Sequence, residues 1–222
     1  MKKFLAFALT MGLLLTLGGC ASSVMTKAPS PELKPPPAGM AQIVFMRDSF
    51  VASAIGCDLL QVENGGKLKF IGVVANATKI AYLTPPGHKV FMAYGTAADF
   101  MEANVVAGKT YFVILRPNWG TGGFAPTPIR HRNSKWSMQN PDFNKWMKDT
   151  DLVVPNAKAP DYFQKNKADF EKLYTRYWAR FQHKTPAERI ERTLQPQDGR
   201  YTQSQAYGDK GGVVPAFFMR RY

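Results

Sequence analysis

Short runs of strand-forming residues, separated by turn signals, occupy the middle of the chain and constrain its fold more than any other feature. They recur at intervals of about 8–12 residues. The runs cover 42–47, 56–63, 67–74, 78–83, 88–94, 100–106 and 110–115. About seven short strands at this spacing are typical of an antiparallel sandwich or barrel, and we favour the sandwich. The sequence therefore predicts an antiparallel β-sandwich over residues 41–131.

Turn chemistry between these runs supports tight connections. Asn64-Gly65-Gly66 is a strong hairpin signal, because asparagine and glycine tolerate the positive φ of such turns. Basic and apolar residues alternate in the run after it, as expected of a strand with one buried face. We therefore expect the strands on either side of this turn to pair.

The pattern becomes helical after about residue 132. Asn140 provides an N-cap, and Pro141 and Asp142 suit the first helical turn, which predicts a helix over Pro141–Lys148. A longer helix is predicted over 160–183, with aromatic residues near helical spacing on one stripe.

A capping-box pattern at Thr185 predicts a third helix that runs through Leu194. The fold class expected is α+β: an antiparallel β-sandwich of about seven strands, followed by a mainly helical extension over 132–222. The final residues, 213–222, are either a docked segment or a mobile tail.

The first twenty residues have the organisation of an export signal. Lys2 and Lys3 precede an apolar run over 4–17, which is too short for a comfortable transmembrane helix. Leu17-Gly18-Gly19-Cys20 then resembles the bacterial lipobox, in which the cysteine is acylated and becomes the first residue of the mature protein. We therefore expect a lipoprotein signal peptide over 1–19 and lipidation of Cys20.

Acyl chains on Cys20 would attach the protein to a membrane without spanning it. Each buried methylene contributes about 0.8 kcal/mol, and stable anchoring requires more than one chain. An aspartate directly after the cysteine commonly marks inner-membrane retention in Gram-negative lipoproteins, whereas this chain has Ala21. The sequence thus predicts the outer membrane, a fold facing the periplasm, and a proline-rich tether over 20–40.

Positive charge is concentrated in the predicted helical half. The chain has a formal net charge of +13. Residues 1–40 and 41–131 each carry +3, and residues 132–222 carry +7. Two of the charges, Lys2 and Lys3, leave with the signal peptide. A basic protein of this kind favours anionic partners, but export argues against nucleic acid.

The long predicted helix interleaves basic residues with aromatic ones. This mixture is compatible with binding an anionic envelope polymer or lipid head group. The favoured interpretation is structural, with the aromatic stripe packed on the sandwich and the charges in water. The candidate anionic-ligand surface consists of Lys165, Lys172, Arg176, Arg180 and Lys184.

No motif indicates catalysis, a metal site or a cofactor. The three histidines, His88, His131 and His183, fall in different predicted elements, and a metal site needs three or four ligands together. The glycine-rich segment 120–123 lacks the ending of a phosphate-binding loop, and a strand-to-hairpin turn explains it equally well. The chain is therefore expected to be non-enzymatic, with an envelope hydrolase as the weakest alternative.

Several single residues remain as weaker candidates. Cys57 lies in an apolar run and is expected to be a small buried residue rather than a nucleophile. Asp99 and Glu102 are expected to face solvent. The tryptophans Trp119, Trp136 and Trp146 are expected to be buried between the helices and the sandwich, with an exposed binding platform as the alternative.

Three segments carry a resemblance to a known family. They are Ile43-Val44-Phe45-Met46-Arg47, Leu83-Thr84-Pro85-Pro86-Gly87-His88 and Ala107-Gly108-Lys109-Thr110-Tyr111-Phe112-Val113. Residues 41–116 are similar to an uncharacterised DUF2846-type family of bacterial lipoproteins and envelope proteins. The resemblance implies a small β-sandwich and no catalytic residues, and it does not extend to the helical half.

Overall fold

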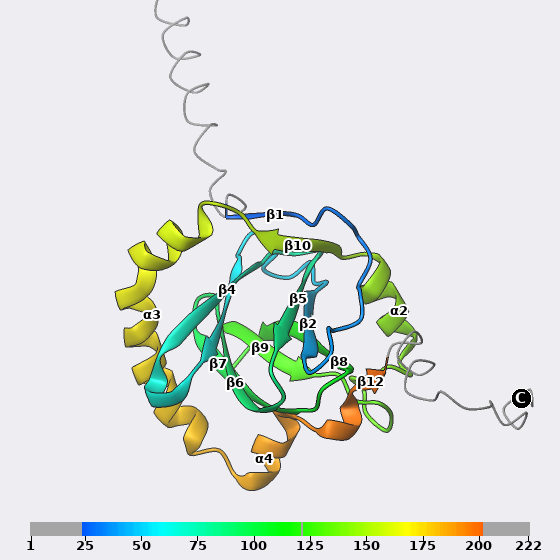
Figure 1. Ribbon diagram of the computed structural model, residues 1–222. Helices are drawn as coiled ribbons and strands as arrows, with labels where there is room; N and C mark the ends of the chain where they lie inside the picture. The colour runs from blue at the N-terminus through cyan, green and yellow to red at the C-terminus, as the bar shows by residue number, and fades with distance from the viewer. Residues whose placement is uncertain (1–23, 121, 202–222) are drawn as a thin grey trace, which may run out of the picture.

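The computed structural model describes residues 24–120 and 122–201, and Figure 1 shows two packed β-sheets flanked by helices. The first sheet contains β1 (Met25–Lys27), β2 (Ala41–Arg47), β5 (Thr78–Thr84), β8 (Lys109–Asn118), β9 (Gly123–Pro128), β10 (Asp151–Pro155) and β12 (Arg200–Tyr201). The second contains β3 (Cys57–Val62), β4 (Leu68–Val74), β6 (Gly87–Tyr94), β7 (Ala98–Val105) and β11 (Thr193–Leu194).

Both sheets mix parallel and antiparallel pairs. The strand order is β1-β10-β5-β2-β8-β12 in the first sheet, with β9 beside β8, and β11-β7-β6-β3-β4 in the second. The α+β class is confirmed, but the wholly antiparallel sandwich is wrong, because β2/β8, β10/β5 and β11/β7 run parallel. Each parallel pair joins strands separated by a long stretch of chain, so local turn signals carried no information about their direction.

The strands predicted from local patterns are present with small shifts in their ends. The Asn64-Gly65-Gly66 turn joins β3 to β4 as expected, and forms a short 3-10 segment (Asn64–Gly66). Strand β9 was not among the predicted runs, and it contains Pro126 and Pro128, which are uncommon within a sheet. It lies at an edge and pairs with β8 alone, where a missing N–H can be tolerated.

The core lies between the two sheets. Phe45 from β2 meets Phe91 from β6 edge-to-face across the interface, with ring centroids 5.1 Å apart. Leu59, Met101 and Val113 pack in the same cluster and are fully buried. Alternate residues of each strand thus fill one common interior.

Helices cover the outer face of each sheet. The predicted helix Pro141–Lys148 is confirmed as α2, and the Asn140 side chain caps it by accepting from Asp142 N. It places Phe143 and Trp146 on the outer face of the first sheet. The long helix α3 (Ala159–Gln182) lies along the second sheet (Figure 1). The molecule is therefore layered helix, sheet, sheet, helix.

The C-terminal region is less helical than predicted. The capping box at Thr185 is confirmed, but α4 (Pro186–Glu191) is short, and Leu194 belongs to strand β11 instead of a helix. A 3-10 turn (Pro196–Asp198) then leads to β12. Residues 151–155, 193–194 and 200–201 thus complete the two sheets formed by the preceding region.

The proline-rich segment departs from the prediction of a free tether. Residue Val24 is buried, β1 pairs with β10, and Pro36 is buried. Leu33 packs partly against the cluster under α2. Segment 24–40 therefore lies along the fold, since its scattered apolar residues find buried positions there. The predicted signal peptide over 1–19, Cys20 and residues 213–222 lie outside the described residues.

Candidate functional site

The candidate anionic-ligand surface lies on and just after α3. Lys165, Lys172, Arg176 and Arg180 are exposed on the helix, whereas Lys184 follows it and is half-buried. Lys167 on the same helix lies 3.8 Å from Glu171, so part of the helix charge is paired. The structure thus places four of the five predicted residues in water.

The aromatic stripe of α3 faces the second sheet. Phe170 and Phe181 are buried, and the partly buried members of the same cluster include Phe163, Tyr174 and Tyr177. Phe170 lies 6.4 Å from Phe70 of β4, with the rings nearly parallel. The stripe packs on the sheet as expected, with Phe170 and Phe181 buried and the other rings partly exposed.

Arg180 and Lys184 line a small cavity of about 220 Å³ near the end of α3. Arg192 also lines it, but its guanidinium is 3.0 Å from Asp99 Oδ2. Asn118 Nδ2 donates to the same Asp99 oxygen at 3.0 Å. The cavity therefore brings the basic side chains of Arg180 and Lys184 to a carboxylate, Asp99, that is already paired with other residues.

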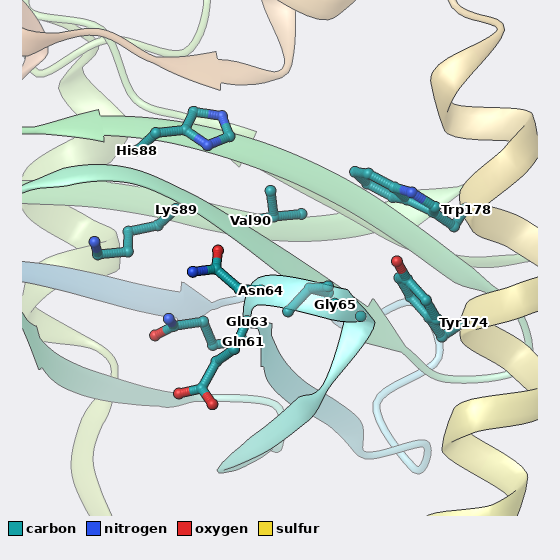
Figure 2. Close-up of a pocket in the computed structure, with 11 residues that line it drawn as sticks. Gln61, Glu63, Asn64, Gly65, His88, Lys89, Val90, Tyr174 and Trp178 are labelled. Atoms are coloured by element: carbon teal, nitrogen blue, oxygen red, sulfur yellow. The ribbon is translucent and has the colours of Figure 1, made fainter.

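A larger cavity of about 580 Å³ lies beside His88 (Figure 2). Gln61, Glu63 and Asn64 line it from the β3–β4 hairpin, and Tyr174 and Trp178 line it from α3. Its lining residues include no serine, threonine or cysteine. His88 Nε2 is 3.9 Å from Glu102 Oε1, and its side chain is more than half exposed. His88 shares this lining with Glu63, Lys89 and Tyr174, but with no serine or threonine hydroxyl and no cysteine thiol.

The aromatic residues of this cavity do not form a stacking platform. Phe181 stacks on Trp178 with centroids 5.4 Å apart, and Tyr174 stacks on Trp178 at 5.8 Å. The Tyr174 ring also lies against Gly66, where a Cβ would come within 2.9 Å of its Cε1. Because these rings are covered by one another and by the hairpin, a sugar ring would find little free aromatic surface.

Cys57 is buried in the core, as predicted. Burial raises the pKa of its thiol well above the usual range, and the neighbouring Asp58 adds to this effect. The reactive thiolate is therefore disfavoured at neutral pH.

The expectation that Asp99 and Glu102 face solvent is wrong. Both side chains are buried, with Asp99 paired to Arg192 and Glu102 paired to Arg189. The arginines come from α4 and the residue after it, about ninety positions along the chain. A local pattern could not reveal these partners, and the two carboxylates serve separate ion pairs.

The expected burial holds fully for Trp146 and partly for Trp136. Trp146 of α2 is buried between the helix and the first sheet. The half-buried Trp136 packs on it, with ring centroids 5.6 Å apart. Trp119 is 81% exposed in the turn between β8 and β9, which corrects the prediction for that residue. Gly120 and Gly122 lie in this turn and Gly123 begins β9, which agrees with the turn interpretation, and Thr121 lies outside the described residues.

Sequence reasoning missed Asp58, a buried carboxyl on β3. Burial raises its pKa to about 6, against the hydrogen bond from Tyr162, which lowers it. Tyr162 of α3 donates from its hydroxyl to Asp58 Oδ1 at 2.9 Å. A tyrosine on an otherwise apolar helix stripe was the signal available, but it does not identify its partner.

The described residues contain no cluster of three or more histidine, cysteine, aspartate or glutamate side chains suited to a metal ion. Within the same part of the chain, no helix is long and apolar enough to cross a bilayer. No protein-family model and no curated protein matches the chain. The resemblance to DUF2846-type lipoproteins stays a prediction.

Proposed function

We propose that this chain is a bacterial lipoprotein, held in the outer membrane by acyl chains on Cys20 and facing the periplasm. Its fold has a non-enzymatic role, and supports or binds another component of the cell envelope. The observation that carries the proposal is the order of features before the fold: a basic start, a short apolar run, and Leu17-Gly18-Gly19-Cys20.

Two features of the fold support a binding or structural role. The cavity beside His88 has no serine, threonine or cysteine among its lining residues, and the thiol of Cys57 is buried. The carboxylates Asp99 and Glu102 are held in ion pairs. These candidates for catalysis therefore serve packing and pairing, and the hydrolase alternative gains no support from them.

Substituting Cys20→Ala tests the anchor, with Cys57→Ala as the matched control at the other cysteine. Cell fractionation is expected to show the Cys57→Ala variant in the outer membrane and the Cys20→Ala variant lost from it. Ala21→Asp is expected to move the acylated protein to the inner membrane. Continued sedimentation of Cys20→Ala with the outer membrane would contradict the proposal.

A second candidate role is electrostatic attachment of α3 to an anionic envelope polymer. The observation that favours it is the exposure of Lys165, Lys172, Arg176 and Arg180 on the helix face opposite the packed aromatics. Such attachment depends on unscreened charge and weakens as ionic strength rises.

The double substitution Arg176→Gln and Arg180→Gln tests this role without disturbing the packed stripe. Co-sedimentation with purified anionic polymer is expected to fall for the variant and to fall for the native chain in high salt. Substitution of the exposed Lys34 by Gln provides a control with one charge removed elsewhere. Binding that is unchanged by high salt and by the two substitutions would exclude α3 as the attachment surface.

A further inference from the structure

The fold begins very close to the proposed anchor. Three residues separate Cys20 from the buried Val24. Four steps of a fully extended chain span at most about 14 Å. Because segment 24–40 lies along the fold, it adds nothing to this reach. If Cys20 is acylated, as proposed above, the surface around Val24 must lie against the head groups.

Exposed apolar side chains gather at one end of the sandwich. We call this the loop end. It consists of the turns between β2 and β3 (48–56), β4 and β5 (75–77) and β6 and β7 (95–97), with residues 119, 120 and 122 between β8 and β9. Eight large hydrophobic side chains are exposed among the described residues, and four of them belong to these turns. The four are Phe50, Val51, Ile55 and Trp119, with Phe50 92% exposed.

Direct contacts hold these turns together. Ser49 N donates to Asn76 Oδ1 at 2.8 Å, which joins the first two turns. Gly95 lies against Ile55, since a Cβ built on Gly95 would be 3.7 Å from Ile55 Cγ2. The hydroxyl of Thr96 donates a hydrogen bond to the carbonyl oxygen of Gly122, which joins the turns β6–β7 and β8–β9. The loop end is therefore one continuous surface that presents apolar side chains from the turns β2–β3 and β8–β9.

A buried arginine fixes the most apolar turn. Arg47 is fully buried at the end of β2, and its guanidinium lies 4.2 Å from the ring centroid of Phe124. It donates hydrogen bonds to the carbonyl oxygens of Ala52 and Ile55. The turn is thus held in a defined conformation with Phe50 directed into solvent, and does not fold its apolar residues inward.

Val24 reaches the fold near the same end. Val24 and Val73 share a small buried cluster, and Val73 N contacts Met25 Sδ at 3.3 Å. Val73 also touches the β2–β3 turn, since a Cβ on Gly56 would come within 2.8 Å of its Cγ1. Figure 1 shows β1 and β10 across one end of the sheets.

Charges around this end are compatible with an anionic surface. Asp48 and Asp149 both lie within 3.0 Å of Lys145 Nζ, and Asp151 lies 2.8 Å from Lys27 Nζ. Lys27 neutralises Asp151, whereas Asp48 and Asp149 share the single Lys145, so most but not all of this negative charge is compensated.

We infer that the loop end is a membrane-contacting surface, with Phe50 and Trp119 inserted into the head-group region of the bilayer that holds Cys20. Aromatic side chains are favourable at this depth, where an apolar ring meets a wet boundary. A lipid surface is favoured over a protein partner because the short link to Cys20 brings this end to the bilayer. The inference rests on the proposed lipidation.

Site-specific fluorophores on the full acylated protein test the inference. Phe50→Cys and Trp119→Cys place a thiol at the apolar turns, and Ala107→Cys places one at an exposed turn of the opposite end. Cys57 is buried and Cys20 would be acylated, so an environment-sensitive thiol reagent labels the introduced cysteine. Each protein is reconstituted into phosphatidylethanolamine–phosphatidylglycerol vesicles that carry nitroxide-labelled lipid.

The fluorescence emission of labels at 50 and 119 is expected to shift to shorter wavelength. The nitroxide lipid is expected to quench these two labels roughly twofold or more strongly than the label at 107, as for side chains buried about 5–10 Å into the interface. Flotation and intact mass report the anchor separately. Floating, acylated protein whose three labels remain equally water-exposed overturns the inference and leaves the proposed function standing. Protein that carries no acyl chain and does not float overturns both.

Discussion

At the scale of single residues, the buried carboxyl of Asp58 makes the most specific prediction. Burial raises its pKa to about 6 in the folded protein, whereas an unfolded aspartate titrates near about 3.9. The folded state therefore binds this proton more tightly than the unfolded state. Between these two values the free energy of unfolding falls as pH rises, by on the order of 2–3 kcal/mol in total.

Asp58→Asn removes this titration while keeping an oxygen that can accept from Tyr162. Denaturant unfolding at pH 4.5, 6 and 8 gives the free energy of unfolding of the native chain and of Asp58→Asn. The difference between the two free energies at each pH isolates the contribution of Asp58. The variant is expected to gain stability relative to the native chain as pH rises, and the gain is complete above about pH 7. A difference that stays constant with pH would show that Asp58 has an ordinary pKa.

Residue environments were predictable where they follow from neighbours in the sequence. The burial of Cys57 followed from its apolar run. The burial of Asp99 and Glu102 did not, because their partners Arg192 and Arg189 lie far along the chain. Arg47 likewise stands at the end of a predicted strand, but its buried contacts with the next turn depend on the folded loop.

At the scale of elements, α3 is a structural helix whose packed and solvated faces differ sharply. Phe170→Ala removes a buried ring that contacts Phe70 and Phe163. Its expected cost is about 3–5 kcal/mol in the free energy of unfolding, because a cavity remains where the ring was. Lys172→Ala on the solvated face is expected to change stability by less than about 0.5 kcal/mol.

Urea unfolding followed by circular dichroism measures both variants on the same helix. A small loss for Phe170→Ala, comparable to that of Lys172→Ala, would mean that α3 does not pack on the second sheet. The two variants therefore test the packing of α3 on the sheet. Binding of an anionic partner by the solvated face is tested separately, by the double substitution Arg176→Gln and Arg180→Gln.

Element boundaries were predictable from local chemistry, and their pairing was not. The cap at Asn140 and the capping box at Thr185 located two helix starts directly. Strand runs separated by turns located seven of the strands. Strands β11 and β12 have two residues each, too few for a periodic pattern, and exist because neighbouring strands offer them hydrogen bonds.

At the scale of the whole molecule, the C-terminal region and the segment after Val24 belong to one layered fold. β10, from the C-terminal region, pairs with β1 at the start of the described chain on one side and with β5 on the other. This arrangement places the fold within a short reach of Cys20. The exposed basic residues of α3 lie on the outside of this fold, away from the core.

The intact mass of the protein extracted from membranes tests the central claim most directly. The account predicts a chain that begins at Cys20, lacks residues 1–19, and carries the added mass of acyl chains on that cysteine. The chain should account for the rest of the mass without further modification. An unacylated chain, or one that still carries residues 1–19, would contradict the account.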